Sequence, residues 1–191
     1  MKLRATSLVC ILAAATLGTA VAQNASEAHV WHGLTVDQST PADADAILGK
    51  PARLGGAKLF LHPVDALFRK GVATSLQSAT YTGVAGMKRV ELFFDDQRLA
   101  AIQLEPETRI DAASLPHVYG LTFTHLASHP GFAAPGGVEP TYSLSGSTDR
   151  ATVLAEIASP LLSRGAIRPD EWPGKVIRIE LISPFVVSAR I

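Results

Sequence analysis

The sequence contains very little cysteine. Cys10 is the one cysteine among 191 residues, and it lies inside the first apolar stretch of the chain. If that stretch is removed from the mature protein, no thiol remains. Disulfides, thiolate metal sites and a cysteine nucleophile are then excluded. Packing and hydrogen bonding must therefore hold the fold together.

Long hydrophobic runs are also scarce, and the one that matters is at the N-terminus. A basic start at Met1–Arg4 precedes an apolar stretch, and Ala20-Val21-Ala22 has the small-x-small pattern of a signal-peptidase site. We expect cleavage after Ala22 and a periplasmic or secreted protein; the alternative is an uncleaved anchor. Cys10 stands at the front of the apolar stretch, which argues against lipid attachment. No later run is long and apolar enough to span a membrane.

Charge of either sign is low and is not gathered in blocks. The 17 basic residues balance 17 acidic ones, and loss of Lys2 and Arg4 with the signal peptide leaves a net charge of −2. This balance argues against a nucleic-acid partner or an anionic lipid surface, because both require a basic face. Low charge with high hydrophobic content is typical of a folded chain. The remaining length suits one ordinary domain or two small ones.

The stretch STPADADAILGKP, Ser39–Pro51, predicts a short helix. Thr40 suits the N-cap, Pro41 suits the first helical position, and Asp43 can close a capping box with Thr40. Gly49 is expected to end the helix. The apolar stripe of this helix would consist of Ala44, Ile47 and Leu48.

The acidic pair in this helix raises the question of a metal site. Asp43 and Asp45 are two residues apart, so on a helix they point about 200° away from each other and cannot share one ion. The further ligands and the spacing of a calcium loop are missing as well. We therefore interpret Asp43 as part of the helix cap and Asp45 as part of its solvated side.

Alternating apolar and polar residues predict several strands. KRVELFFDDQRLAAIQLEP reads as a β-hairpin with its turn at Asp95–Arg98, and KVIRIELI, Lys175–Ile182, is the clearest strand. Shorter strands are expected at residues 57–62, 78–84, 121–127 and 141–146. One or two helical turns are expected within 63–71, and a short helix interrupted by Pro116 within 111–120. Residues 148–160 fit either a helix or a strand.

These elements indicate an α+β fold with short helices packed on an antiparallel sheet. A helix followed by strands occurs in each half, so two tandem helix-plus-sheet units are a further expectation. The expected division is a polar leader at 23–33, a first unit at 34–105 and a second α+β half at 106–191. That second half could be a diverged repeat packed on the first.

The segment LTVDQSTPADADAILGKP resembles the helix signature of small outer-membrane-assembly lipoproteins of the SmpA/OmlA type. It is also similar to the related tandem fold of secreted β-lactamase-inhibitor proteins. The positions that fit the pattern are Leu34, Ser39, Thr40, Asp43, Ala44, Leu48, Gly49 and Pro51. Asp37 stands where those families have glycine, and the lipidation cysteine is missing. The resemblance extends to the hairpin at Val90–Glu105, and it implies a helix-on-sheet module that binds other proteins without catalysis.

The histidines are the remaining candidates for chemistry. His117, His125 and His129 fall close together, and the last two have the i, i+4 spacing that could place two imidazoles on zinc if they were helical. LTFTH alternates like a strand, however, and Pro130 disfavours helix at His129. The Glu of a metalloprotease helix is also absent from HLASH. No serine has the Gly-x-Ser-x-Gly frame of a nucleophile elbow. The sequence therefore assigns no catalytic residue, no metal ligand and no cofactor.

Three functional hypotheses follow from these observations. The first is an exported, non-catalytic envelope or periplasmic module that binds or helps to assemble other proteins. The second is an exported hydrolase with a site, in one form zinc-dependent, built from His117, His125, His129 and an unidentified acid. The third is a secreted inhibitor, which only the family resemblance implies.

Overall fold

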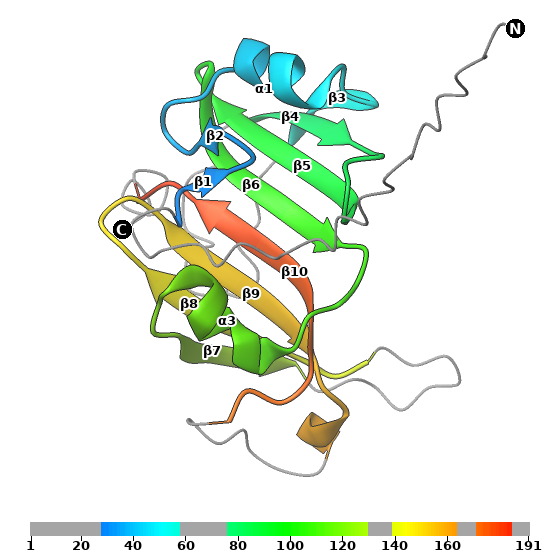
Figure 1. Cartoon of the computed structure of the whole chain (residues 1–191), viewed down its shortest axis with the longest axis vertical. Coiled ribbons are helices and arrows are strands. Elements are labelled where there is room, and N and C mark those ends of the chain that lie inside the picture. Colours follow the sequence, from blue (N-terminus) through cyan, green and yellow to red (C-terminus); the bar gives the residue numbers. More distant parts are fainter. Residues whose placement is uncertain (1–27, 58–75, 130–138, 164–170, 185–191) are drawn as a thin grey trace, which may run out of the picture.

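The alternating segments pair into one large antiparallel sheet. The computed structural model describes residues 28–57, 76–129, 139–163 and 171–184. Eight strands lie in the order β3-β4-β5-β6-β10-β9-β8-β7 (Figure 1), and a small separate sheet pairs β1 with β2. The strands are β1 (Val30–Trp31), β2 (Leu34–Thr35), β3 (Arg53–Ala57), β4 (Leu76–Tyr81), β5 (Met87–Asp95), β6 (Arg98–Pro106), β7 (Thr124–His129), β8 (Thr141–Ser147), β9 (Thr152–Ala158) and β10 (Lys175–Ile182).

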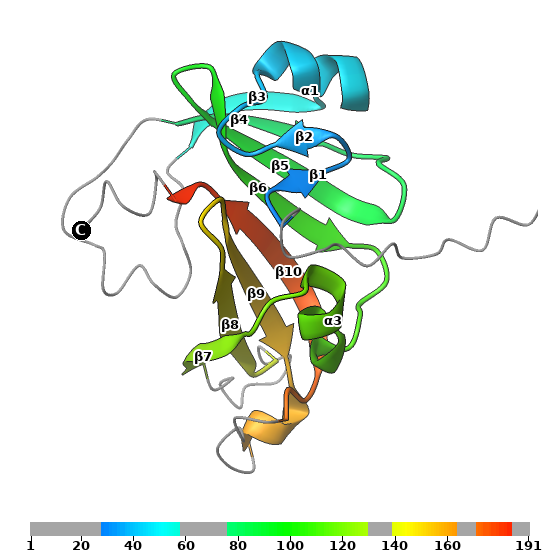
Figure 2. The same cartoon turned by 60° about the vertical axis from the view of Figure 1, so that its left-hand side comes forward.

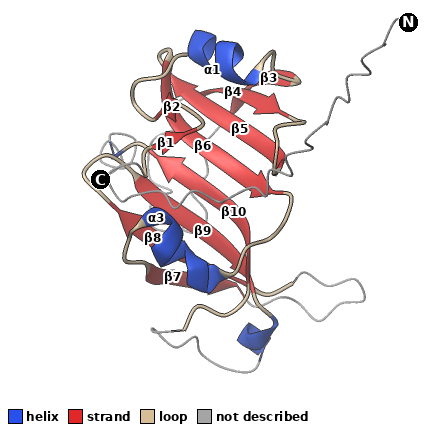
Figure 3. Ribbon diagram, viewed as in Figure 1, coloured by secondary structure: helices blue, strands red, loops and turns tan. Residues whose placement is uncertain are grey.

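Helices are few and short in the described part of the chain. The α-helices are α1 (Pro41–Leu48) and α3 (Leu115–Tyr119), and the 3-10 turns are η2 (Ala112–Ser114) and η3 (Pro160–Ser163). Figure 3 shows how small the helical share is beside the strands. The α+β class with an antiparallel sheet is thus confirmed. Among the described helices, none has the length and apolar character that crossing a membrane requires.

Helix α1 begins as its sequence predicts. The Thr40 hydroxyl accepts the backbone N–H of Asp43, and the Asp43 carboxylate accepts the backbone N–H of Thr40 at 2.8 Å, which completes the capping box. These hydrogen bonds, first from the Thr40 backbone and then from its hydroxyl, hold the pKa of Asp43 below its usual range. The apolar stripe is only partly buried: Ala44 is buried, whereas Ile47 is 46% exposed.

Replacing Thr40 with alanine is expected to lower the free energy of unfolding by about 1 kcal/mol at neutral pH, because the first turn loses its side-chain cap. The Asp43 carboxylate contributes only when ionised. Its lowered pKa means that this contribution is present above the unfolded-state pKa and is lost as pH falls through the folded-state pKa. Urea denaturation should therefore show a smaller difference between the two proteins below about pH 3 than at pH 7. The alanine variant keeps the backbone N–H that Asp43 accepts, so an equal difference at both pH values would contradict only the hydrogen bond from the Thr40 hydroxyl to the ionised Asp43 carboxylate.

The predicted hairpin is present as β5 and β6. Val90, Leu92 and Phe93 pair with Leu104, Ile102 and Ala101 across the two strands. The turn residues Asp96 and Gln97 both have positive φ, 44° and 69°, which is the geometry that matches the right-handed twist of paired strands.

Other elements differ from the expectation in their position or type. The strand expected at 78–84 is β4 and ends at Tyr81, and the one expected at 121–127 is β7 and begins at Thr124. Residues 148–160, which fit two states, contain strand β9. Pro116 does not interrupt a helix, because it lies in the first turn of α3, where its missing N–H costs nothing. The strand expected at 57–62 lies outside the described residues except for Ala57, which ends β3, and the helical turns expected within 63–71 lie outside them entirely.

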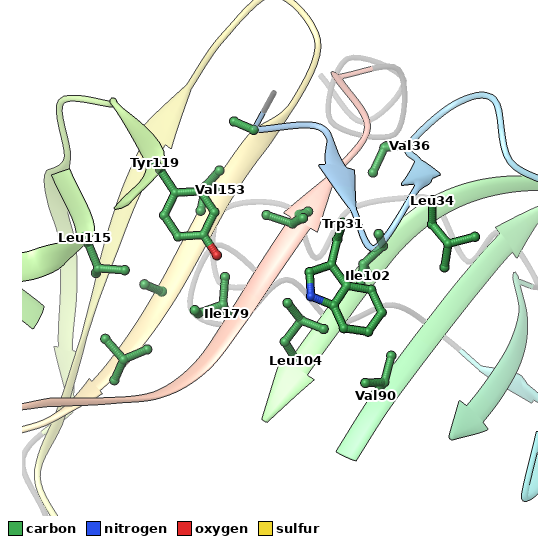
Figure 4. Packing of buried hydrophobic residues seen from close by; sticks show 14 of the residues in the cluster. Trp31, Leu34, Val36, Val90, Ile102, Leu104, Leu115, Tyr119, Val153 and Ile179 are labelled. Atoms are coloured by element: carbon green, nitrogen blue, oxygen red, sulfur yellow. The ribbon is translucent and has the colours of Figure 1, made fainter. Parts of the chain in front are cut away.

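One face of the sheet carries the main core. The β1–β2 hairpin and α3 lie over this face (Figures 1 and 2), and α1 adds Ala44 to the same cluster. Figure 4 shows Trp31 beside Val90, Ile102 and Leu104, with Leu115 and Tyr119 from α3 farther along the sheet. Trp31 lies in the segment that the sequence analysis assigns to a polar leader. Its burial makes residues 28–33 part of the packed fold.

On the opposite face of the sheet, the two ends of the strands carry different kinds of residue. One end holds a second buried cluster that consists of Leu76, Phe93, Ala100, Ala101, Leu154 and Ile182. Side chains on one strand alternate between faces, so the residues two and four positions from this cluster share its face. At the other end of the strands most of these residues are charged, and they form a polar surface.

Candidate binding face

Charged residues cover one end of the sheet face that lies opposite the helices. We call this surface the charged face and define it as Arg89, Glu91, Gln103, Glu105, Glu156, Arg178 and Glu180, from the neighbouring strands β5, β6, β10 and β9. The register places Glu91 beside Gln103, Gln103 beside Glu180, and Arg178 beside Glu156. Residues directly opposite each other on antiparallel strands point to the same side. One polar surface therefore crosses four strands.

The charged face is centred on the contact between β6 and β10. These two strands pair only where Ala101–Leu104 faces Ile179–Ile182, although β6 continues to Pro106 and β10 begins at Lys175. A register shift between Val176 and Arg178 adds one residue to β10 relative to β9. Such a bulge bends a strand and re-aims its side chains.

A cavity of about 210 Å³ lies where β6 and β10 separate. It is lined by Lys88, Glu105, Pro106, Arg109, Ile177 and Arg178. Arg178 reaches toward Glu156, with Nη1 3.4 Å from Oε2. Its Nε is buried and has no hydrogen-bond partner among the described residues. Because a buried donor is usually paired, this Nε–H is free to donate one further hydrogen bond.

The charged face is acidic on balance. Four of its side chains are carboxylates and two are guanidinium groups, and Arg89 and Glu91 form an ion pair at 2.6 Å. Their side chains are 46% and 16% exposed, so the pair lies at the surface and contributes little to stability. Glu180 is buried, whereas the side chains of Glu91 and Glu156 are 16% and 20% exposed and can meet basic side chains of another molecule at the surface.

The two acidic side chains of α1 have different partners: Asp43 belongs to the helix cap, and Asp45 is exposed but also contacts β4. Tyr81 of β4 donates its hydroxyl to Oδ1 of Asp45 at 3.2 Å. Burial, and then the Asp45 charge, raises the pKa of Tyr81 to about 12. The reason is the position of α1 above the end of β4, which helix periodicity alone does not reveal.

The three candidate histidines lie on two different elements. His117 is exposed on α3, His125 is exposed on β7, and His129 ends β7. His125 and His129 are therefore on a strand, not on a helix that could bring them to one zinc ion. Within residues 28–57, 76–129, 139–163 and 171–184, no three His, Cys, Asp or Glu side chains are grouped closely enough to hold a metal ion.

One contact on β7 has the distance of a serine–histidine pair. Nε2 of His125 is 2.9 Å from Oγ of Ser128. Both side chains are exposed on the last strand of the sheet, and no carboxylate contacts the imidazole among the described hydrogen bonds and ion pairs. A nucleophile needs a base that a third group orients. The contact therefore lacks the third member of such a site.

Sequence reasoning missed the charged face because it followed the histidines. A signal was present, since Glu91, Arg178 and Glu180 occupy the polar positions of two strongly alternating strands. Which strands become neighbours, however, is a property of the tertiary structure. The pairing of β6 with β10 joins residues that are about eighty positions apart in sequence.

Comparison with known proteins places this chain in no established group. No family model matches it, and no curated protein sequence matches it. A crystal structure of an extracellular protein containing an SCP domain from Bacillus anthracis str. Ames is similar, with a TM-score of 0.41 and 7% identity. The match covers 81% of this chain and 46% of that one, so this chain spans about half of that protein's length. Likeness at this level carries no argument about fold or function.

Proposed function

We propose that this protein is an exported, non-catalytic module of the periplasm or cell envelope that binds other proteins or helps to assemble them. The observation that carries the proposal is the charged face, which crosses four neighbouring strands while the opposite sheet face is occupied by the core. A broad polar surface whose described cavities are small, about 210 and 10 Å³, suits a protein surface better than an enclosed small molecule, since ligand pockets are concave and mostly apolar. The N-terminal pattern that ends at Ala22 supports export.

We also propose that the chain consists of two tandem helix-plus-sheet units of the type that the resemblance implies. In support, α1 precedes the meander β3-β4-β5-β6, and α3 precedes the meander β7-β8-β9-β10. The last strands of the two meanders, β6 and β10, are the ones that pair. Asp37, which stands where the resembled families have glycine, has φ of 68°. Glycine adopts that conformation without strain, which supports the assigned correspondence.

The charge of the charged face suggests the chemistry of its partner. Three partly exposed carboxylates, Glu91, Glu105 and Glu156, outnumber the two arginines of the charged face, so the complementary surface is expected to be basic. Arginine is the residue that most often anchors such contacts, because its planar fork binds a carboxylate through two hydrogen bonds. Binding is then expected to weaken as ionic strength rises.

Replacing Glu105 with lysine is expected to reduce partner capture at least about tenfold, because two like charges would then meet across the interface. Asp149 lies exposed in the turn between β8 and β9 and offers a matched control, since Asp149→Lys changes the net charge equally away from the charged face. The measurement is photo-crosslinking in cells, followed by identification of the adduct. A reactive residue at position 105 or 149 of the otherwise unchanged chain locates the contact, and a reactive residue at position 103, on the same face as Glu105, compares capture by the two lysine variants.

The crosslinking results at positions 105 and 149 together test the proposal. A specific protein adduct from position 105 that is lost at high salt, and none from position 149, is the expected result. Equal adducts from both positions, or unchanged capture by Glu105→Lys, would remove the charged face from the function. Release of the partner's hydrolysed product instead of an adduct would favour the hydrolase hypothesis.

A further inference from the structure

The two edge strands of the large sheet differ in how well they are protected. β7, at one edge, has a register shift between His125 and Ala127 in its pairing with β8. β3, at the other edge, pairs with β4 over five consecutive positions without a shift. Proteins usually protect an edge with a bulge, a proline or charged side chains; β3 has no bulge and no proline, and its one charged residue is Arg53. The outer edge of β3 has no neighbouring strand among the described residues.

On one face of β3, the side chain of Leu54 projects outward and Gly56 leaves open space beside it. Leu54 is 73% exposed, the most exposed of the large apolar side chains in the described residues. It lines a cavity of about 400 Å³ that also borders Asp45 and Tyr81 beneath α1. Gly56 lies two positions along and therefore on the same face. Among the described residues, no heavy atom lies within 4 Å of the place where a Cβ on Gly56 would be.

We infer that β3 binds β3 of a second copy of this chain, antiparallel and centred on Gly55. In this register Leu54 of each copy lies opposite Gly56 of the other, so that each projecting side chain covers the other copy's open position. Arg53 lies opposite Ala57, so the two positive charges do not meet. The contact is its own complement, as a two-fold interface requires. Both sheets then continue through the junction with their helices on the same side.

Other registers between the two β3 strands match Leu54 with Gly56 less well. Centring on Leu54 would place the two leucines directly opposite each other and would leave Gly56 uncovered. A shift by one residue would turn the second copy over, because neighbouring residues on a strand point to opposite faces. Only the Gly55-centred register, among those compared, places Leu54 of each copy over Gly56 of the other.

The interface is short, and the dimer is expected to be weak. Stable dimers bury roughly 800 Å² on each partner, more than the outer edge of a five-residue strand supplies. Association should therefore follow mass action, with monomer at low protein concentration and dimer at high concentration. The charged face is on the sheet surface and not at this edge, so the two contacts can occur together.

Replacing Gly55 with cysteine tests the register directly. The experiment uses the full chain with Cys10→Ser, so that the introduced thiol is the only one. Gly55 has no positive φ, and a Cβ there would meet only Oγ of Ser78, at 3.7 Å, an ordinary contact. Two such cysteines would face each other on the two-fold axis, within the separation that a disulfide spans. We expect a covalent dimer on mild oxidation.

Gly56→Cys is the matched control. In the proposed register its two thiols belong to residues whose Cα atoms are about 8 Å apart, beyond the reach of a disulfide. We expect no covalent dimer from this variant. Covalent dimer from Gly56→Cys but not from Gly55→Cys would overturn the proposal, since it would require another register.

Leu54→Asp supplies a second measurement that needs no oxidation. Sedimentation between about 5 and 500 µM should show concentration-dependent dimer for the unchanged chain and monomer throughout for Leu54→Asp. Leu126→Asp places the same change on edge strand β7 and should leave the dimer intact. A chain that stays monomeric over this range would overturn the proposal. If such a monomer formed an adduct from position 55 with a different polypeptide in cells, the edge would belong to that partner instead.

Discussion

Replacing Gly174 with alanine is expected to lower the free energy of unfolding by about 3 kcal/mol or more. Gly174 precedes β10 and has φ of 104°, a conformation that side chains with a Cβ rarely adopt. An added Cβ would collide with the carbonyl oxygen of Ala158 and lie 2.9 Å from Cβ of Ser159. The carbonyl of Gly174 also accepts the backbone N–H of Ala112. Urea denaturation would measure the loss.

Gly83→Ala separates the backbone cost from the collision. Gly83 also has a positive φ, 76°, but among the described residues no atom lies within 4 Å of the added Cβ. We expect this variant to lose only about 1 kcal/mol, the cost of the left-handed conformation alone. Equal losses at the two positions would show that the contact with β9 does not constrain Gly174.

Replacing Trp31 with alanine is expected to cost about 3–5 kcal/mol, the range for a large side chain removed from a core. Trp31 is 8% exposed and belongs to the main hydrophobic cluster, where it joins the β1–β2 hairpin to the sheet. Its removal would leave a cavity above Leu104 and Ile102, beside which Figure 4 places its ring. Thermal or urea denaturation followed by circular dichroism would measure the change, since fluorescence would lose one of its two reporters.

Trp172 is the natural comparison. It is partly buried and stacks on Tyr142, with ring centroids 6.5 Å apart, so Trp172→Ala is expected to cost about 1–2 kcal/mol. If Trp31→Ala lost only about as much stability as is expected for Trp172→Ala, the N-terminal hairpin would not have the stabilising role assigned to it.

Local elements were predictable where the physics that forms them is local. Thr40, Pro41 and Asp43 predict the start of α1 because a capping box depends on residues three positions apart. The β5–β6 hairpin was predictable for a similar reason, since its two strands are joined by a short turn and alternate strongly. Strand β10 was predicted with the bounds that the structure has.

Elements whose state depends on distant neighbours were less predictable. Residues 152–158 could have been helical by sequence, yet they form β9 because β8 and β10 pair with it on both sides. Asp45 is exposed, as expected, but the placement of α1 also brings it to Tyr81, a contact that the helix sequence did not indicate. The segment around Trp31 looked polar because only a few of its residues are apolar, and those few are the ones that pack.

The charged face shows the same contrast between features set by nearby residues and features set by distant ones. Alternation along each strand indicates which positions are polar, but it does not give the order of the strands in the sheet. By itself, the amino-acid sequence determined the local elements, because caps, turns and alternation act over a few residues. The N-terminal pattern yields a prediction of export. The tertiary structure decided that β6 meets β10, that a charged surface crosses this contact, and that β3 is left at an edge, because pairing between distant strands depends on the whole arrangement of the core.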